Sequence, residues 1–316
     1  MQTFAFEKDI MINHFPDGVW PTMITPFTPT YKIDYQSLEH IIEWYIERHT
    51  DGLFAVCQSS EMWHLSLAER VHLARFVAEK ANGRVPVIAS GHTGERLADQ
   101  IVELDQIADT GIQGLVLVTN RLATPKENDD HFKKNVDILL QHLPPEIPLG
   151  LYECPYPKKR LISPELLRFC EDTQRFYFLK DTSCDLDMMR AKLDALSGRL
   201  KIYNANAATL HASYKLGISG YSGVMANFHP TLYRWHFENF AHSAAAEEVA
   251  ELLCIASLIE RQNYPVNAKY HMHLEGIDIG LYTRARDYTK FSPAQQLEVE
   301  QMRSLVNRFC ERFCFS

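Results

Sequence analysis

The sequence lacks the cysteine pairs that mark a structural zinc site or a redox dithiol. Its seven cysteines include no C-x-x-C pair, and an odd number of cysteines does not make a complete disulfide framework. Cys310 and Cys314 are four residues apart, a spacing that predicts neighbours on one helix face. We therefore expect no metal site and no cofactor, and free thiols favour a reducing cytoplasm.

Basic stripes and long apolar runs are also missing. The formal net charge is −8, from 32 basic and 40 acidic residues, which argues against a nucleic-acid partner. No apolar run reaches the ~20 residues of a membrane-spanning helix, so we expect no membrane partner. Glu7, Lys8 and Asp9 interrupt the short apolar stretches of residues 1–15, so this segment does not have the apolar core of a signal peptide.

What the sequence does have is a steady alternation of strand and helix patterns. With 316 residues, 46% of them hydrophobic, the chain can bury one large core. Eight near-continuously apolar runs predict parallel strands buried on both faces. They lie near residues 18–24, 52–56, 85–90, 114–118, 148–152, 176–180, 200–204 and 220–225. Helical patterns follow them near residues 37–48, 68–82, 95–110, 128–142, 163–173, 186–197, 207–216 and 230–242.

Eight consecutive βα units predict an α/β fold of the (βα)8 TIM-barrel class. An open doubly wound sheet is the alternative, and no G-x-G-x-x-G turn supports it. Residues 244–261 and 293–312 also have helical patterns. We therefore expect a barrel with a short N-terminal extension over residues 1–242, and a C-terminal helical appendage packed on it over residues 243–316.

Lys180 is the strongest candidate for a catalytic residue. It ends the apolar run of residues 176–179, where loss of hydration disfavours an ammonium group and lowers its pKa. A neutral amine is a nucleophile. In a parallel barrel the carboxyl ends of the strands form the catalytic edge, and Lys180 lies at such an end. The alternative is a lysine whose charged end simply extends into water.

Two other predicted strands end in polar residues. Tyr152 ends the fifth strand shortly before Pro155 and could transfer protons, although a core tyrosine with a satisfied hydroxyl is the alternative. Ser59 and Ser60 follow the second strand, in a loop whose hydroxyls and N–H groups suit a carboxylate. An ordinary polar turn is the alternative there. Because a barrel brings these strand ends to one rim, the three signals point to one pocket.

Histidines give weaker signals. His92 follows the third predicted strand and could line the pocket, although a structural role at the start of the next helix is the alternative. His271 and His273 are two residues apart, so on a helix they point away from each other. We assign them no metal site.

These segments resemble the dihydrodipicolinate synthase and N-acetylneuraminate lyase family, whose members are barrels that react through a lysine Schiff base. The resemblance covers about residues 18–284. It rests on the segments Thr22 to Phe27, Cys57 to Glu61, Tyr152 to Pro155, Lys180 to Ser183 and the glycine-rich stretch 217–230, which includes Val224. The resemblance implies that Thr22 and Val224 line the substrate site.

The resemblance also implies a role for each candidate residue. Lys180 would attack the ketone of pyruvate or a related 2-oxo acid and form an iminium. Tyr152 would relay protons to and from the substrate. Ser59 and Ser60 would hold the carboxylate of the 2-oxo acid. The implied protein is a metal-independent lyase of the class I aldolase type, cytoplasmic and a homotetramer.

The chain departs from the family pattern at three places. The loop at residues 57–61 lacks the family's two glycines. Residues 119–122 read Thr-Asn-Arg-Leu, where the synthases carry paired tyrosines, one of them part of a proton relay across a subunit interface. Residues 158–160 read Lys-Lys-Arg, with a spacing that does not match the arginine with which the synthases bind their second substrate.

These departures predict aldol cleavage, condensation or dehydration of a 2-keto-3-deoxy sugar acid rather than the synthase reaction. Arg121 or Lys158 would suit a second polar group of such a substrate if either faces the pocket. Both residues can equally be solvated loop residues. A dihydrodipicolinate synthase proper and a non-catalytic barrel that binds a 2-oxo acid are the alternative functions.

Overall fold

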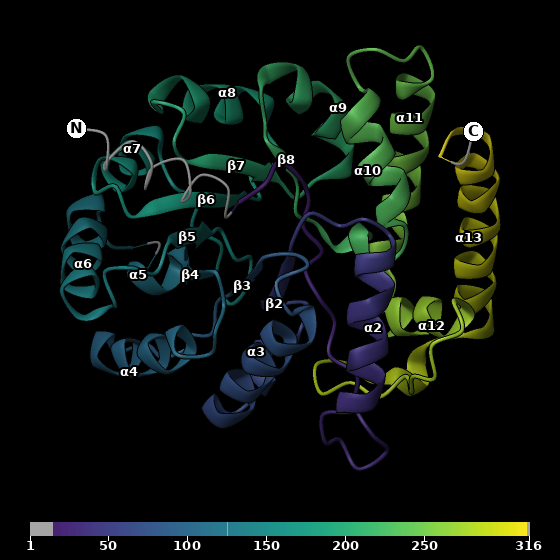
Figure 1. Cartoon of the computed structure of the whole chain (residues 1–316), viewed down its shortest axis with the longest axis horizontal. Helices are drawn as coiled ribbons and strands as arrows, with labels where there is room; N and C mark the ends of the chain where they lie inside the picture. Colours follow the sequence, from purple (N-terminus) through teal and green to yellow (C-terminus); the bar gives the residue numbers. More distant parts are fainter. Residues whose placement is uncertain (1–14, 125, 315–316) are drawn as a thin grey trace.

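Eight parallel strands form a closed barrel at the centre of the molecule (Figure 1). The computed structural model describes residues 15–124 and 126–314. Neighbouring strands pair in the order β1-β8-β7-β6-β5-β4-β3-β2, and a parallel bridge between Thr22 and Phe54 closes the ring. The strands are β1 Gly18–Val19, β2 Leu53–Val56, β3 Val87–Ala89, β4 Gly114–Val118, β5 Leu149–Tyr152, β6 Phe176–Asp181, β7 Lys201–Asn204 and β8 Gly220–Tyr221. The predicted (βα)8 barrel is confirmed.

Helices surround the barrel and continue beyond it (Figure 1). Those that follow the strands are α2 Tyr35–Glu47, α3 Leu67–Ala81, α4 Leu97–Ala108, α5 Thr119–Leu122, α6 Asp129–His142, α7 Pro164–Asp172, α8 Leu186–Ala195, α9 Ala207–Leu216 and α10 Pro230–Asn239. The C-terminal helices are α11 Ala246–Ala256, α12 Val266–Leu274 and α13 Pro293–Phe313. Short 3-10 turns are η1 Met62–His64, η2 Val224–Asn227, η3 Ser257–Arg261 and η4 Tyr288–Lys290.

Several helices begin where their sequence signals predict. The Ser163 side chain accepts a hydrogen bond from the N–H of Leu166 at the start of α7, with Pro164 in the first turn. At the start of α13, Ser292 and Gln295 form a reciprocal capping box. Each cap satisfies donors that the first helical turn would otherwise leave open.

The first and last strands are shorter than their apolar runs predict. The first run spans residues 18–24, but only Gly18–Val19 are strand, because Pro21 has no N–H to donate to a ladder. Beyond it the chain meets β2 through single contacts, such as the hydrogen bond from the N–H of Met23 to the oxygen of Phe54, 3.0 Å. The eighth run ends at Tyr221 and turns into η2.

The C-terminal region differs from its sequence pattern in two ways. Residues 244–261 predict one helix, but α11 ends at Ala256 and η3 follows. The helix α12 is not predicted at all, because its fully buried Asn267 and Lys269 break the apolar periodicity of a core helix. Helices α11 and α13 pack against α10, and α12 packs against α13. The division at residue 242 stays a prediction.

Aromatic side chains fill the amino-terminal half of the barrel interior. The rings of Phe178 and Tyr203 stack at 4.5 Å, and Trp20 lies 5.5 Å from Phe178. Gly52 leaves space for this cluster, since a Cβ there would lie 2.4 Å from the Trp20 ring. The Tyr203 hydroxyl donates to the carbonyl of Pro16, 2.9 Å. With this end of the barrel filled, the carboxyl ends of the strands are left to form a site.

Candidate active site at the carboxyl end of the barrel

Lys180 lies inside the carboxyl end of β6 and is only 4% exposed. Burial lowers its pKa from 10.5 to about 8, while Cys57, Cys154 and Glu260 oppose this shift. No hydrogen bond or ion pair engages its Nζ within residues 15–124 and 126–314. With a pKa of about 8, roughly a tenth of Lys180 is neutral at pH 7 and about half at pH 8, and this neutral amine is the form that attacks a ketone.

Two further lysines are buried in the described part of the chain, and both are paired. Lys192 contacts Glu153 and Asp181. Lys269 lies 3.0 Å from Glu61 and donates to the carbonyl oxygen of Tyr282 at 2.6 Å. Burial also lowers the pKa of Lys269 to about 8. Burial therefore does not distinguish Lys180 from the other two lysines. What distinguishes it is that no described residue forms a hydrogen bond or ion pair with its Nζ.

Tyr152 is the neighbour of Lys180 across the sheet. The two residues are register partners on β5 and β6, so their side chains point to the same face of the sheet. The Lys180 Nζ lies 5.1 Å from the centre of the Tyr152 ring. Burial, with the nearby Cys154 and Cys57, raises the pKa of Tyr152 well above 10. Its hydroxyl therefore stays protonated and can donate a proton to a group that develops negative charge.

The loop after β2 brings Ser59 and Thr22 to the same rim. Ser59 Oγ donates to Thr22 Oγ1 at 3.2 Å. The N–H groups of Ser59 and Ser60 point to the Cys57 sulfur, and neither has an oxygen acceptor in the described residues. Adjacent N–H groups that point to one atom are the arrangement that binds anions in other proteins. The Ser60 hydroxyl itself is engaged, since it donates to the Cys57 carbonyl at 2.7 Å.

The missing glycines of this loop leave no backbone strain. Neither Cys57 nor Ser60 has a positive φ, so neither position requires glycine. The left-handed residue is Glu61, with φ 62°. Its carboxylate accepts hydrogen bonds from Thr283 Oγ1 and the N–H groups of Arg284 and Ala285, besides its contact with Lys269. The C-terminal region thus holds the loop in place.

A second cluster joins the eighth strand to the C-terminal region. The Asn227 amide donates to the carbonyl oxygens of Thr22 and Val224 and to the Tyr264 hydroxyl, at 2.9, 2.8 and 3.1 Å. Tyr264 also contacts Ser59. Val224, a predicted substrate contact, begins η2 at this rim and is partly buried. No local sequence signal predicts Tyr264 at the site, because its partners Asn227 and Ser59 are far from it along the chain.

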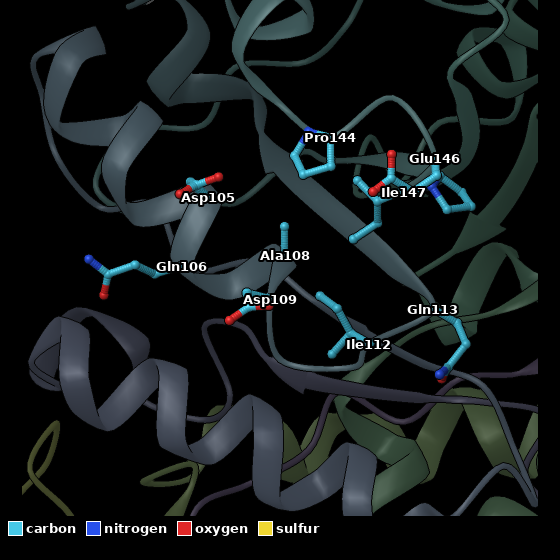
Figure 2. A pocket seen from close by; sticks show the side chains of 10 residues that line it. Asp105, Gln106, Ala108, Asp109, Ile112, Gln113, Pro144, Glu146 and Ile147 are labelled. Carbon is cyan, nitrogen blue, oxygen red and sulfur yellow. The ribbon is translucent and has the colours of Figure 1, made fainter.

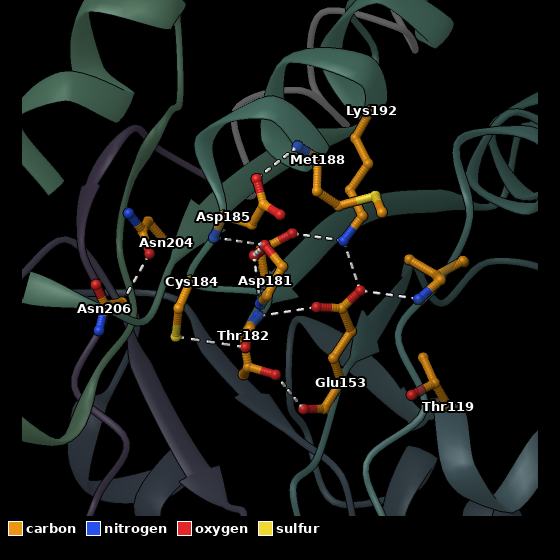
Figure 3. Close-up of polar contacts among 12 residues, drawn as sticks. Thr119, Glu153, Asp181, Thr182, Cys184, Asp185, Met188, Lys192, Asn204 and Asn206 are labelled. Atoms are coloured by element: carbon orange, nitrogen blue, oxygen red, sulfur yellow. Dashed lines mark hydrogen bonds and ion pairs between the residues drawn. The ribbon is translucent and has the colours of Figure 1, made fainter. Parts of the chain in front are cut away.

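Behind the pocket, Lys192 connects two buried carboxylates (Figure 3). Its Nζ lies 2.6 Å from Glu153 and 2.5 Å from Asp181. Successive strand residues face opposite sides of a sheet, so Tyr152 and Lys180 face the barrel interior while Glu153 and Asp181 face α8. Burial raises the pKa of Glu153 and Lys192 opposes this rise. The pKa of Lys192 is raised, because its two carboxylate partners outweigh burial.

This charged cluster fixes the ends of β5 and β6. Glu153 accepts hydrogen bonds from the N–H groups of Thr182 at 2.8 Å and Ile162 at 2.9 Å. The Thr182 hydroxyl donates to the Glu153 carbonyl at 2.7 Å (Figure 3). The two strand ends that carry Tyr152 and Lys180 are therefore held together by charge-assisted hydrogen bonds.

The end of β4 carries a stacked arginine. The Arg121 guanidinium lies 4.7 Å from the centre of the Trp63 ring, and Trp63 packs against Tyr156 with ring centres 5.4 Å apart. Arg121 is 4.0 Å from the exposed Glu95. Lys158 is exposed on the loop after β5. Arg121 thus lies at the rim, while Lys158 is a solvated loop residue.

The histidines that the sequence singles out are structural. His92 is fully buried; it contacts Gln100 at 3.0 Å and accepts a hydrogen bond from the N–H of Val118 at 2.6 Å. His271 is buried against Trp44 and Phe228. Burial lowers the pKa of both rings to about 4.

A groove of about 610 Å³ lies at the opposite end of the barrel (Figure 2). It runs between α4 and the loops that precede β4 and β5, and its charged side chains are Asp105, Asp109 and Glu146. These acids face no buried lysine or tyrosine of the rim described above. We therefore place the candidate site at the carboxyl end, where Lys180, Tyr152 and the loop that carries Ser59 and Ser60 meet.

Comparison with known proteins shows the family of the chain. The family model described as "Dihydrodipicolinate synthetase family" matches residues 16–307. The chain belongs to this family. The resemblance seen in the sequence is thereby confirmed, together with the assignment to lyase-type barrels of this family.

Relatives and solved structures cover most of the chain. It is 28% identical over 272 residues to the 4-hydroxy-tetrahydrodipicolinate synthase of Clostridium tetani, covering 83% of this chain and 89% of that protein. Dihydrodipicolinate synthase DapA-2 of Bacillus anthracis superposes with a TM-score of 0.82 at 18% identity, covering 91% of this chain and 97% of that one. YagE of E. coli K12, solved in complex with pyruvate, has a TM-score of 0.80 at 20% identity, covering 92% and 98%.

Proposed function

We propose that the protein is a Schiff-base lyase that acts on pyruvate or a related 2-oxo acid. The observation that carries the proposal is the buried Lys180, whose lowered pKa of about 8 makes its amine available and which no carboxylate of the described residues pairs with, beside the protonated Tyr152. Attack by this amine on a ketone gives an iminium, which accepts electrons when a carbon–carbon bond breaks or forms. The complex of YagE with pyruvate supports a 2-oxo acid as substrate.

In this proposal the loop after β2 orients the 2-oxo acid. The N–H groups of Ser59 and Ser60 and the Ser59 hydroxyl bind the carboxylate, and Thr22 supports that hydroxyl. Fixing the carboxylate there directs the adjacent ketone to Lys180, a positioning effect that can lower a barrier by several kcal/mol. Val224 borders the same site. Tyr152 transfers the protons that the addition and elimination steps require. Neither a metal nor a cofactor is part of this mechanism.

For the second half of the substrate we propose a 2-keto-3-deoxy sugar acid. Residues 119–122 end β4 as Thr-Asn-Arg-Leu, so the phenol of the synthase relay has no counterpart there. Thr119 and Asn120 instead bind main-chain oxygens of the loop after β5, at 2.6 Å to Arg160 and 2.9 Å to Cys154. These side chains brace the loop after β5, and neither supplies a phenol in place of the relay tyrosine.

A dihydrodipicolinate synthase proper is the second candidate. The name of the Clostridium tetani relative favours it. This candidate requires another residue to replace the missing relay tyrosine, and Arg121 to bind the second substrate's carboxylate.

Coupled assays on one preparation separate these candidates. We expect aspartate semialdehyde with pyruvate to turn over poorly, and at least one 2-keto-3-deoxy acid or acylated sugar acid to be cleaved or dehydrated faster. Loss of a charge-assisted carboxylate contact costs about 1.5–3 kcal/mol, or roughly 10- to 150-fold in rate. Efficient condensation with the semialdehyde and no activity on sugar acids would reverse the ranking. Binding of pyruvate without any turnover would indicate a non-catalytic barrel.

Tyr152→Phe is expected to lower turnover by about 10²-fold or more while the fold is retained, because it removes one proton-transfer group. Steady-state kinetics on the best substrate measure the effect. Tyr203→Phe is the matched control: it removes a buried hydroxyl at the far end of the barrel and should affect stability but not turnover. Unchanged turnover in Tyr152→Phe would make this residue a packing residue.

We further propose a homotetramer in the cytoplasm, as the family resemblance implies. Sedimentation across a wide range of concentrations tests the assembly.

No helix among the described residues is long and apolar enough to cross a membrane. The question of a signal peptide falls on residues 1–14, which lie outside the described residues.

A further inference from the structure

Glu260 is a carboxylate near the active-site rim for which the described residues provide no donor. It lies in η3, which packs against η2 at the end of β8. A hydrogen bond of 2.7 Å from the Asn267 amide to the Ile259 carbonyl holds this turn. The Glu260 side chain is partly buried, yet its carboxylate makes no hydrogen bond and no ion pair with any residue that the structure describes.

Glu260 interacts electrostatically with the reacting lysine. Burial raises the pKa of Glu260, and the charges of Lys180 and then Arg261 oppose this rise. Glu260 in turn acts on Lys180 and raises the pKa of that amine. It also acts on Cys184 and on three tyrosines of the neighbouring elements, Tyr221, Tyr233 and Tyr264.

The other buried carboxylates near the rim behave differently. Glu61 accepts from a lysine, a threonine hydroxyl and two N–H groups. Glu153 accepts from Lys192 and two N–H groups, and Asp181 from Lys192 and Ser183. Buried polar groups in native proteins are normally satisfied in this way. Glu260, which is only partly buried, differs from these three carboxylates in having no donor among the described residues, and it is coupled electrostatically to Lys180.

We propose that Glu260 is a specificity-determining residue that accepts hydrogen bonds from hydroxyl groups on the chain of the substrate bound to Lys180. This inference rests on the proposed function. A carboxylate offers two oxygen acceptors, which suits neighbouring hydroxyls of a polyhydroxylated chain. Hydrogen bonds to a charged group discriminate strongly in a desolvated site, and a second carboxylate placed there would be repelled.

Borohydride trapping tests the subsite without requiring turnover. Each acid reduced onto Lys180 gives an adduct that intact mass detects, and the concentration for half-maximal adduct reports its binding. The probes are pyruvate and a set of 2-keto-3-deoxy acids with increasing numbers of hydroxyls. We expect Glu260→Gln to raise the half-maximal concentration of the hydroxylated acids about 10- to 100-fold and to change that of pyruvate little. Glu251→Gln, an exposed carboxylate on α11, should change neither.

A second readout separates this role from a structural one. Because Glu260 raises the pKa of Lys180, Glu260→Gln should move the pH midpoint of pyruvate trapping to lower pH. Its thermal midpoint should be unchanged or higher, since the carboxylate lacks a protein partner. A lower thermal midpoint with an unshifted pH profile would make Glu260 structural and overturn the proposal.

The outcomes also distinguish this inference from the proposed function. If wild-type protein forms no pyruvate adduct, the proposed function fails. If pyruvate adds and Glu260→Gln leaves the trapping of the hydroxylated acids unchanged, only the Glu260 subsite is overturned. If pyruvate adds but no hydroxylated acid does, the proposed sugar-acid substrate fails together with the subsite. A stronger effect on an amino-substituted chain than on a hydroxylated one would identify an ammonium site and equally overturn it.

Discussion

Replacing Lys180 by alanine or by arginine is expected to abolish both the adduct that pyruvate and borohydride form with the protein and all turnover. Alanine removes the nucleophile, and arginine keeps the charge but cannot lose its proton to attack. Wild-type protein should gain one pyruvyl-derived group, and peptide mapping should place it on Lys180. An adduct of equal yield in the variants would remove the proposed mechanism.

The other buried lysines are internal controls for this experiment. Lys269 has a pKa lowered to about 8, as Lys180 has, but Glu61 and a carbonyl oxygen hold its Nζ. Lys192 is held between two carboxylates. Neither should carry the group. The yield at Lys180 should rise as the pH increases through about 8, because deprotonation exposes the nucleophilic amine.

Replacing Lys192 by methionine is expected to lower the free energy of unfolding by about 3–5 kcal/mol, because it leaves the buried carboxylates of Glu153 and Asp181 without their cation. Denaturant unfolding measures the loss. Arg190→Met is the control on the same helix, since Arg190 is exposed, and should stay within about 0.5 kcal/mol of wild type.

The loss in Lys192→Met should depend on pH. Burial raises the pKa of Glu153 and Lys192 opposes this rise, so the variant raises that pKa further. A carboxyl whose pKa is raised in the folded state destabilises that state progressively as the pH rises from the unfolded pKa to the folded pKa, and this destabilisation is absent below the unfolded pKa. Lys192→Met should therefore recover stability on acidification relative to wild type. A loss near zero at neutral pH would show that the cluster does not hold the strand ends.

The cluster of Lys192, Glu153 and Asp181 can be predicted from the sequence only in part. The dipeptides Tyr152-Glu153 and Lys180-Asp181 each send one side chain into the barrel and the next toward α8, as the two-residue period of a strand requires. Local pattern therefore predicts that Glu153 and Asp181 point away from the pocket. It does not predict that Lys192, on the next helix, lies between them, because that depends on how α8 packs on the sheet.

Some residues of the candidate site could be predicted from local sequence patterns and others could not. Lys180, Tyr152 and Ser59 follow apolar runs directly, so strand periodicity and the barrel rule bring them to one rim. Tyr264 and Glu260 come from irregular C-terminal turns whose path over the barrel has no local signal. The apolar content of the first and last runs also does not predict how short β1 and β8 are. Their lengths depend on backbone hydrogen bonding near Pro21 and Gly223.

The sequence by itself determined the eight βα units, the barrel and the lysine at the end of the sixth strand, because these depend on periodicity and on residues adjacent in the chain. Only the tertiary structure decided which buried lysine is free. Lys180, Lys192 and Lys269 are all buried, and the reactivity of each depends on whether a carboxylate from a distant segment reaches it. That distinction arises from packing between elements far apart in sequence, and no local pattern encodes it.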